Sequence, residues 1–226
     1  MKFTLPKILA IITICVGSVV MAGWFLDIAI LKSILPTWVT MKFTTALCFV
    51  MGGLLLFSID RVREPGEKST TAEILLPISS IIMAFLMGAL LFSVIFQVKL
   101  GIGDLFVKEA AGAVKPTKPG IPSSGTMVSF LAIAIVGLLQ LFEGEDLTIK
   151  TIHFLGWIVA LAGGLAIVGY VFDVEVLYYT LEGVSTAMAF HTAILFVFLG
   201  LGMIAIKHDE EEPISIWPHL DRKAGA

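Results

Sequence analysis

The sequence predicts an all-α integral membrane protein with six transmembrane helices, arranged as three tandem helical hairpins. Hydrophobic residues make up 58% of the 226 residues and charged residues only 15%, with a mean hydropathy of +0.98. A soluble domain is about half apolar and a quarter charged. The apolar excess lies in long uncharged runs. In addition, one sequence pattern recurs along the chain, which indicates a supersecondary unit used more than once.

Six uncharged runs are the expected helices: Ile8–Leu26, Phe43–Ile59, Ile74–Phe96, Gly125–Phe142, Ile152–Phe172 and Thr186–Ile206. A helix needs about 20 apolar residues to cross a bilayer core, with a lower limit of about 17. Each run therefore predicts one span. Residues 1–206 form the expected membrane domain, with repeats at about 8–59, 74–142 and 152–206, and residues 207–226 form a short acidic cytoplasmic tail containing Trp-Pro.

The first run also resembles a signal peptide. Lys2 and Lys7 precede an apolar stretch, and Val20-Met21-Ala22 resembles a cleavage site. The repeat argues against cleavage, because Gly23-Trp24 matches Gly169-Tyr170 at the end of the fifth run. The first run is therefore interpreted as a helix of the mature protein, and cleavage stays as the alternative.

The repeat has two parts. Gly23-Trp24-Phe25-Leu26-Asp27-Ile28 is followed by Met41-Lys42-Phe43-Thr44-Thr45-Ala46-Leu47-Cys48-Phe49. Near the end of the chain, Gly169-Tyr170-Val171-Phe172-Asp173-Val174 is followed by Met188-Ala189-Phe190-His191-Thr192-Ala193-Ile194-Leu195-Phe196. A degenerate middle copy has Ser93–Val98 and Thr126–Phe130. Asp27, Gln97 and Asp173 thus occupy equivalent outer helix ends.

The second helix of each expected hairpin carries a stripe of Thr, Phe and a small residue, each four positions apart. The three stripes are Thr45/Phe49/Gly53, Thr126/Phe130/Ala134 and Thr192/Phe196/Gly200. Spacing of four keeps side chains on one helix face, and small residues allow close approach of helices in membranes. The stripes are interpreted as helix-packing seams, with a ligand-binding face as the alternative.

The connections differ in character. Thr70-Thr71-Ala72-Glu73 predicts a capping box that starts the third helix. The segment Asp27–Thr40 is strongly apolar but too short to span, so we expect it to lie in the membrane interface or to fold over the helix ends. Val174–Leu181 is its counterpart in the last repeat, while Lys99–Ser124 is rich in Gly and Pro and is expected to be mostly irregular.

Asp27, Gln97, Asp173 and His191 are the candidate ligand-binding residues. Carboxylates at the edge of the hydrocarbon are costly and often mark ligand or ion sites. If the hairpins pack around a common axis, these groups could line a shallow outer pocket roofed by the apolar segment. The alternative is structural: each carboxylate reaches water, caps a turn or pairs with a lysine such as Lys32, and His191 is hydrogen-bonded at a helix start.

No pattern indicates catalysis, a metal or a cofactor. His153 and His191 are expected near opposite membrane faces, and no Cys or His spacing resembles a zinc or haem site. The expected helix centres lack charged residues, which argues against a proton-driven transporter. A net charge of −3 and a pI of 5.8 without a basic stripe argue against nucleic acid as a partner.

The positively charged residues predict the orientation. With six helices, nine of the fifteen Lys and Arg residues lie on the side of both termini and six on the other. Because cytoplasmic loops carry an excess of Lys and Arg, both termini are placed in the cytoplasm. The expected location is the cell membrane of a bacterium or archaeon, with multiple spans.

These motifs resemble those of a known membrane region. Gly23-Trp24-x-Leu26, Leu35-Pro36, Met41-x-x-x-Thr45-Ala46-Leu47-Cys48-Phe49, Gly101–Phe106 and Met188–Phe196 are similar to the N-terminal multi-helix input region of bacterial and archaeal sensor histidine kinases and diguanylate cyclases. The resemblance covers nearly the whole chain. It departs at Ile206, where the family continues into an output domain and this chain has a tail interrupted by Pro213.

The resemblance implies a non-catalytic sensory module that relays a membrane or external cue. Its partners would be the lipid bilayer and a kinase or cyclase, and homo-oligomers are possible. The alternative is a small-solute transporter or an accessory subunit of a membrane complex.

Overall fold

The fold is known from a computed structural model, which describes residues 4–35, 37–64, 69–107, 119–140, 145–178 and 186–207. All regular secondary structure in these ranges is helical. In chain order the elements are α1 (Leu5–Phe25), α2 (Ala29–Lys32), α3 (Phe43–Val62), α4 (Thr70–Ile95), η1 (Ile102–Asp104), α5 (Ser124–Leu139), α6 (Glu145–Val171), η2 (Glu175–Leu177) and α7 (Phe190–Ile204). The predicted all-α class is confirmed.

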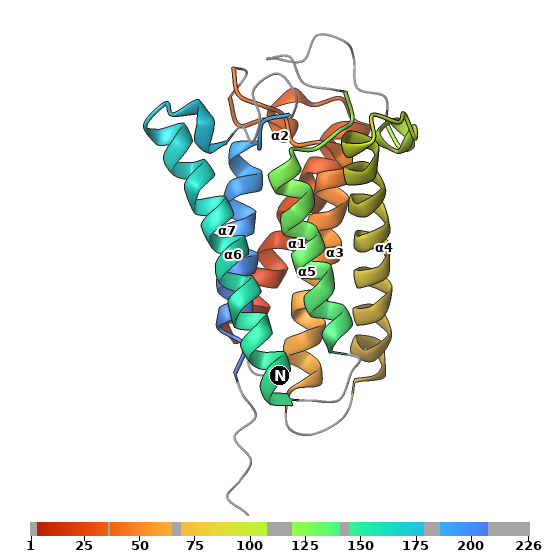
Figure 1. Ribbon diagram of the computed structural model, residues 1–226, viewed down its shortest axis with the longest axis vertical. Coiled ribbons are helices and arrows are strands. Elements are labelled where there is room, and N and C mark those ends of the chain that lie inside the picture. The colour runs from red at the N-terminus through yellow and green to blue at the C-terminus, as the bar shows by residue number, and fades with distance from the viewer. Residues whose placement is uncertain are drawn as a thin grey trace, which may run out of the picture.

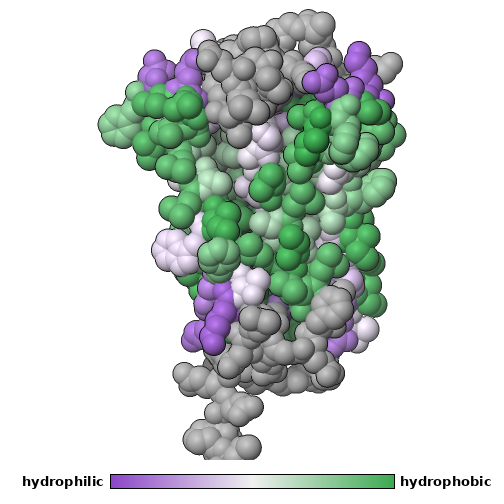
Figure 2. Space-filling model, viewed as in Figure 1, coloured by the Kyte–Doolittle hydropathy of each residue, from purple (hydrophilic) through white to green (hydrophobic). Residues whose placement is uncertain are grey.

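Four helices, α1, α3, α4 and the Ile149–Val171 part of α6, are long and apolar enough to cross a membrane. α5 and α7 are apolar but shorter, with 16 and 15 residues. Large apolar side chains face outward from the long helices, including Phe85 on α4 and Phe154 and Trp157 on α6. Figure 2 shows this apolar surface as a broad band, with hydrophilic residues near the two ends. A band of this kind is typical of a surface that faces lipid rather than water.

The helices form one bundle (Figure 1). α3 packs against α1 and α4, α5 against α4 and α6, and α7 against α6 and α1, while α3 also contacts both α5 and α7. Each long helix therefore contacts the next in a closed circuit that runs through α1, α3, α4, α5, α6 and α7 and back to α1. We call the end at which α1, α4 and α6 terminate and α3, α5 and α7 begin the upper end, as in Figure 1.

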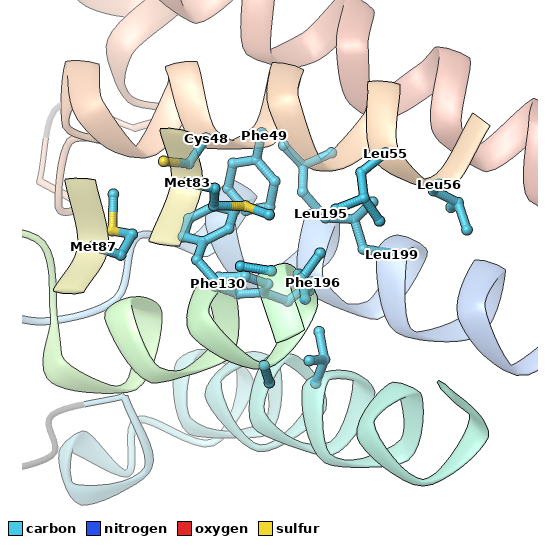
Figure 3. Close-up of a cluster of buried hydrophobic side chains, with 14 of the residues drawn as sticks. Cys48, Phe49, Leu55, Leu56, Met83, Met87, Phe130, Leu195, Phe196 and Leu199 are labelled. Atoms are coloured by element: carbon cyan, nitrogen blue, oxygen red, sulfur yellow. The ribbon is translucent and has the colours of Figure 1, made fainter. Parts of the chain in front are cut away.

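Three phenylalanines fill the middle of the bundle. Phe49 of α3, Phe130 of α5 and Phe196 of α7 are fully buried, and their ring centroids are 4.8, 5.0 and 4.9 Å apart in the three pairs. Figure 3 shows these rings meeting between the helices. Edge-to-face and tilted contacts at this distance are favourable beyond the burial of area alone. We call these three residues the phenylalanine cluster.

The start of α4 differs from the predicted capping box. Ser69 rather than Thr70 is the N-cap, and its side chain makes no cap hydrogen bond. With Ser69 in that position the third helical residue is Ala72, which has no side-chain acceptor to return to the backbone. The helix therefore starts one residue earlier than predicted, and it has no capping box.

Candidate functional site

The three polar residues predicted at outer helix ends share one unusual backbone conformation. Asp27, Gln97 and Asp173 have φ values of 53°, 55° and 54°, and they are the only non-glycine residues with positive φ in the described ranges. After each of them, the next N–H donates to the carbonyl five residues earlier, in the pairs Ile28–Gly23 (2.9 Å), Val98–Ser93 (3.1 Å) and Val174–Gly169 (2.8 Å). This bond belongs to the Schellman motif that ends helices.

The conformation accounts for the aspartates at two of the three positions. Left-handed backbone is unfavourable for most side chains but is tolerated comparatively well by short polar ones such as Asp. Asp27 also pairs with Lys32, with 2.6 Å between Oδ1 and Nζ, and its side chain is 93% exposed. The hydrogen bond from Lys32 lowers the pKa of Asp27, so the carboxyl stays ionised. In this solvated position the pair adds little stability.

The structure separates two of the four predicted ligand residues, Gln97 and Asp173. Gln97 and Asp173 are exposed like Asp27, and the upper ends of α4 and α6 lie on opposite sides of the bundle (Figure 1). His191 is buried in the first turn of α7, and its Nε2 has no hydrogen-bond partner. None of the four residues is among those that line the cavity described below.

Aromatic side chains at two helix ends hold the chain that starts the next long helix. Trp24 Nε1 donates to the carbonyl oxygen of Met41 at 2.9 Å, and Tyr170 Oη donates to that of Met188 at 2.9 Å. Both methionines directly precede an N-cap residue. The two aromatic residues therefore help to fix where α3 and α7 begin.

Backbone hydrogen bonds also hold the chain at Met41 and Met188, just before α3 and α7. Met41 N–H donates to Lys32 O at 2.9 Å, and Met188 N–H donates to Tyr178 O at 3.0 Å. Glycine is needed at the facing helix ends, because a Cβ on Gly23 would lie 2.5 Å from Leu31 Cβ. A Cβ on Gly169 would lie 2.8 Å from Tyr178 Cδ1. The chain between the helices is thus held closely on the helix ends.

The apolar segment after α1 folds over the upper end. Trp38 packs on Tyr170 and on Phe190, with ring centroids 5.2 and 4.7 Å apart. These contacts join the segment between α1 and α3 to α6 and α7. They place an apolar cover beside the start of α7, one of the three helices (α3, α5 and α7) that carry the phenylalanine cluster and that we call the inner helices.

A small cavity lies where α3, α5 and α7 begin. Its lining consists of residues that precede these helices or form their first turn: Thr40, Met41, Lys42, Thr45, Pro122, Ser123, Thr126, Thr186, Ala187, Ala189 and Thr192. The space that a guest could occupy is small. This is room for about one water molecule.

The cavity wall is rich in hydrogen-bond donors. The N-cap residues of all three helices, Lys42, Ser123 and Ala189, are in the wall. The Ser123 hydroxyl accepts from Thr126 N–H at 3.0 Å, whereas α3 and α7 have no side-chain cap. Since the first N–H groups of a helix lack intrahelical partners, the cavity faces two uncapped helix starts.

Two buried side chains add to this polarity. Lys42 is 3% exposed, and Thr186 is 2% exposed. The Thr186 hydroxyl is buried without a hydrogen-bond partner. A buried polar group without a partner is unfavourable by about 1–3 kcal/mol. The arrangement suits a guest that accepts hydrogen bonds.

All nine residues of the predicted packing stripes are buried. Thr45, Thr126 and Thr192 line the cavity, and one turn below them stand the residues of the phenylalanine cluster. Farther along two of the stripes, a Cβ on Gly53 would lie 2.8 Å from the Ala10 carbonyl oxygen of α1, and one on Gly200 would lie 2.6 Å from that of Gly156 in α6. These two stripes thus have a polar end at the cavity and a tightly packed end against a neighbouring helix.

The stripe of α5 ends differently. Ala134, its small residue, is buried with 1% of its surface exposed, but the position of α5 that has no room for a Cβ is Gly137, three residues later. A Cβ on Gly137 would collide with Ser80 Oγ of α4 and would lie 2.6 Å from Leu55 Cδ1 of α3. The prediction named Ala134 as the small packing residue and missed Gly137, because spacing of four from Phe130 does not reach position 137.

Sequence reasoning missed Lys42, Ser123 and Thr186 as site residues. Lys42 and Ser123 precede the stripe threonines by three residues, the distance from an N-cap to the third residue of a helix. The spacing could therefore have identified Lys42 and Ser123 as N-cap residues beside the stripe threonines. Thr186 carries no comparable pattern, because its position depends on how the segment before α7 is folded.

A second polar cluster lies at the lower end of the bundle. Lys7 has a fully buried side chain, and its Nζ lies 3.4 Å from Asp60 Oδ2 and 2.8 Å from Glu64 Oε2. Thr4 Oγ1 donates to Asp60 at 2.8 Å, and Arg61 reaches Glu64 at 2.6 Å. The cluster joins the start of α1 to the end of α3. Lys7 was expected only as part of a basic start to the chain.

No protein-family model, curated protein sequence or solved structure matches the chain. Within the described residues, no group of three or more His, Cys, Asp or Glu side chains is placed to hold a metal ion.

Proposed function

We propose that the protein is a six-span membrane sensory module, built from three tandem hairpins, with both termini in the cytoplasm. The hairpins would be α1–α3, α4–α5 and α6–α7. α5 and α7 measure only about 23 Å at 1.5 Å per residue, but each is preceded by buried chain, including residues 186–189 before α7. This extra length supports a crossing by all six long helices.

The observation that carries the function is the relation between the cavity and the phenylalanine cluster. The cavity occupies the upper end, and three fully buried rings fill the bundle one helical turn below it. A transporter needs a path on which a solute can reach the other side. A small polar cavity above a packed aromatic layer instead favours detection of a ligand without passage.

α7 offers a route for the signal. Its start lines the cavity through Ala189 and Thr192, and its end lies near the start of α6, where His153 Nε2 and Ile206 O are 2.9 Å apart. The last 20 residues of the chain follow this point. A shift of α7 on ligand binding would therefore reach the lower end directly. The resemblance to sensor input regions makes a kinase or cyclase the expected recipient.

Photo-crosslinking in native membranes tests this function. A photoreactive amino acid in place of exposed Lys207, just after α7, is expected to capture a protein that carries a kinase or cyclase domain. The same amino acid in place of Ile30, which is 74% exposed at the upper end, is the matched control and should not capture it. Capture of a respiratory or transport complex from position 207 would refute the sensory function and favour the accessory-subunit alternative.

Cysteine labelling tests the number of spans. Cys15 is exposed and Cys48 is buried, so a Cys15→Ser background leaves only a shielded thiol. Single cysteines are then introduced at four exposed positions along the chain, which are Lys99, Lys150, Val176 and Lys207.

Six spans place positions 99 and 176 outside and positions 150 and 207 inside. A membrane-impermeant maleimide is therefore expected to label the first two in intact cells and the other two only after permeabilisation. If position 150 labels like position 99, α5 does not cross the membrane. If position 207 labels like position 176, α7 does not cross. A fully reversed pattern would show that the termini face outward.

A further inference from the structure

We propose that the upper cavity binds a single water molecule, which hydrogen-bonds to the Thr186 hydroxyl and completes the caps of α3 and α7. This water is the resting occupant of the cavity. Its binding depends neither on the sensory function nor on the orientation of the chain in the membrane, because it follows from the polar groups of the cavity wall alone.

The three helices that begin at the cavity are capped in different ways. In α5 the N-cap residue Ser123 accepts a hydrogen bond from the backbone N–H of Thr126 at 3.0 Å. The N-cap residues of α3 and α7 are Lys42 and Ala189, and neither side chain makes a cap hydrogen bond. Neither side chain has an acceptor atom. The first N–H groups of α3 and α7 therefore lack the partner that Ser123 provides in α5.

The two uncapped helix starts lie at the same cavity. Thr45 and Thr192 are the third residues of α3 and α7, and both line it, as Thr126 of α5 does. The N–H of the third residue is a usual donor to an N-cap side chain. Because the cavity has room for about one water molecule, a water there lies against both helix starts. Its oxygen can take the role that Ser123 Oγ has in α5.

Thr186 provides an observation that is independent of the helix starts. The residue lines the cavity and is 2% exposed, and its hydroxyl has no hydrogen-bond partner. Buried polar side-chain atoms nearly always have a partner in the protein or in ordered water. A water molecule in the cavity accepts a hydrogen bond from this hydroxyl. It thereby joins the segment before α7 to the first turns of α3 and α7.

The chemistry of the wall selects an uncharged polar guest. Its hydroxyl groups come from Thr40, Thr45, Ser123, Thr126, Thr186 and Thr192. A hydroxyl group both donates and accepts hydrogen bonds, and a buried water typically makes about three of them to such groups. An apolar guest would leave the buried polar groups without partners, which is unfavourable. The described residues of the wall include no carboxylate that would favour a metal ion.

An isosteric substitution tests the site through the sign of its effect. Thr186→Val removes the hydroxyl and keeps the shape of the side chain. If water binds this hydroxyl, the variant loses a hydrogen bond, and we expect its Tm in lipid nanodiscs to fall by about 2–4 °C. If the hydroxyl has no partner, valine removes an unfavourable buried group, and Tm stays the same or rises.

Thr44→Val is the matched control. Thr44 lies in the first turn of α3, is 1% exposed and also has a hydroxyl without a hydrogen-bond partner, but it is not part of the cavity wall. The Tm of this variant should equal or exceed that of the wild type, because the same change is made without loss of a bound water.

Solid-state NMR in the same nanodiscs detects the water directly. Magnetisation that starts on water protons should reach the backbone amides of Thr45 and Thr192 in the wild type, and this transfer should weaken in Thr186→Val. The amides of Phe49 and Phe196, one turn deeper in the same two helices, are the internal controls and should receive none.

Either of two results would overturn the water site. One is a Tm of Thr186→Val that does not fall below that of Thr44→Val. The other is a wild-type spectrum without transfer to the Thr45 and Thr192 amides. If Thr186→Val does not fold, the wild-type spectrum still decides. Neither measurement needs a signalling partner, so a failure of the sensory function in the crosslinking from position 207 is seen separately.

Discussion

Replacing Phe130 by alanine should lower the free energy of unfolding by about 3–5 kcal/mol, the usual loss for a large buried aromatic side chain. Phe130 is fully buried and contacts the rings of Phe49 and Phe196 at centroid distances of 4.8 and 4.9 Å. Removing it leaves a cavity at the point where three inner helices meet. The surrounding helices also pack on their outer partners, which limits how far they can collapse into the space.

Unfolding in mixed detergent micelles measures this effect. Phe85→Ala is the matched control, because Phe85 lies on α4 with 68% of its surface exposed on the apolar face, and it should change the unfolding free energy by less than about 1 kcal/mol. A double-mutant cycle of Phe130 and Phe196 should show coupling of about 0.5–1.5 kcal/mol for the ring contact. Equal losses for Phe130→Ala and Phe85→Ala would contradict a closed aromatic layer.

Replacing Gly200 by alanine should destabilise the bundle by about 1–3 kcal/mol or more, the usual range for overpacking. A Cβ at this position would lie 2.6 Å from both Ala160 N and Gly156 O of α6. Both are backbone atoms, so no flexible side chain can give way and the two helices must separate. Such a separation would loosen the contact along α7, which links the cavity with the lower end.

Gly164 provides the control for this substitution. It lies in α6, and a Cβ there would meet no atom within 4 Å. Gly164→Ala should therefore leave stability unchanged or raise it slightly, because alanine is the better helix former. Thermal unfolding of the two variants side by side in the same nanodiscs gives the comparison. If Gly200→Ala is as stable as Gly164→Ala, α6 and α7 do not depend on close backbone approach.

The repeat was visible in the sequence, but its physical meaning was not. Gly-aromatic-x-x-Asp was interpreted as a polar ligand position at a helix end. In the structure, the glycine leaves room for the chain that folds back over the helix end, and the aromatic side chain donates a hydrogen bond to the backbone just before the next helix. Asp27 and Asp173 adopt left-handed backbone. A motif that ends a helix and a motif that binds a ligand draw on the same short polar residues. Residue type alone therefore did not separate the two uses.

The stripes show a different case, because one buried face meets a cavity at its upper end and a neighbouring helix farther along. Spacing of four put Thr45, Phe49 and Gly53 on one face, and that face is buried throughout. Which part of the face meets a helix and which part meets a cavity depends on where the inner helices start. The long-range contacts of Trp24, Trp38 and Tyr170 determine those starting points.

The sequence by itself determined the helical class, the apolar surface and the approximate ends of the long helices. Hydropathy and periodicity are local properties, and a helix satisfies its backbone hydrogen bonds within its own segment, as a lipid environment requires. Only the tertiary structure decided the cavity. Lys42, Ser123 and Thr186 lie in three segments far apart in the chain and are brought together by packing between helices. The buried ion cluster of Lys7 with Asp60 and Glu64 arises for the same reason, since a charge near one helix end is paired or solvated according to the neighbour that the fold places beside it.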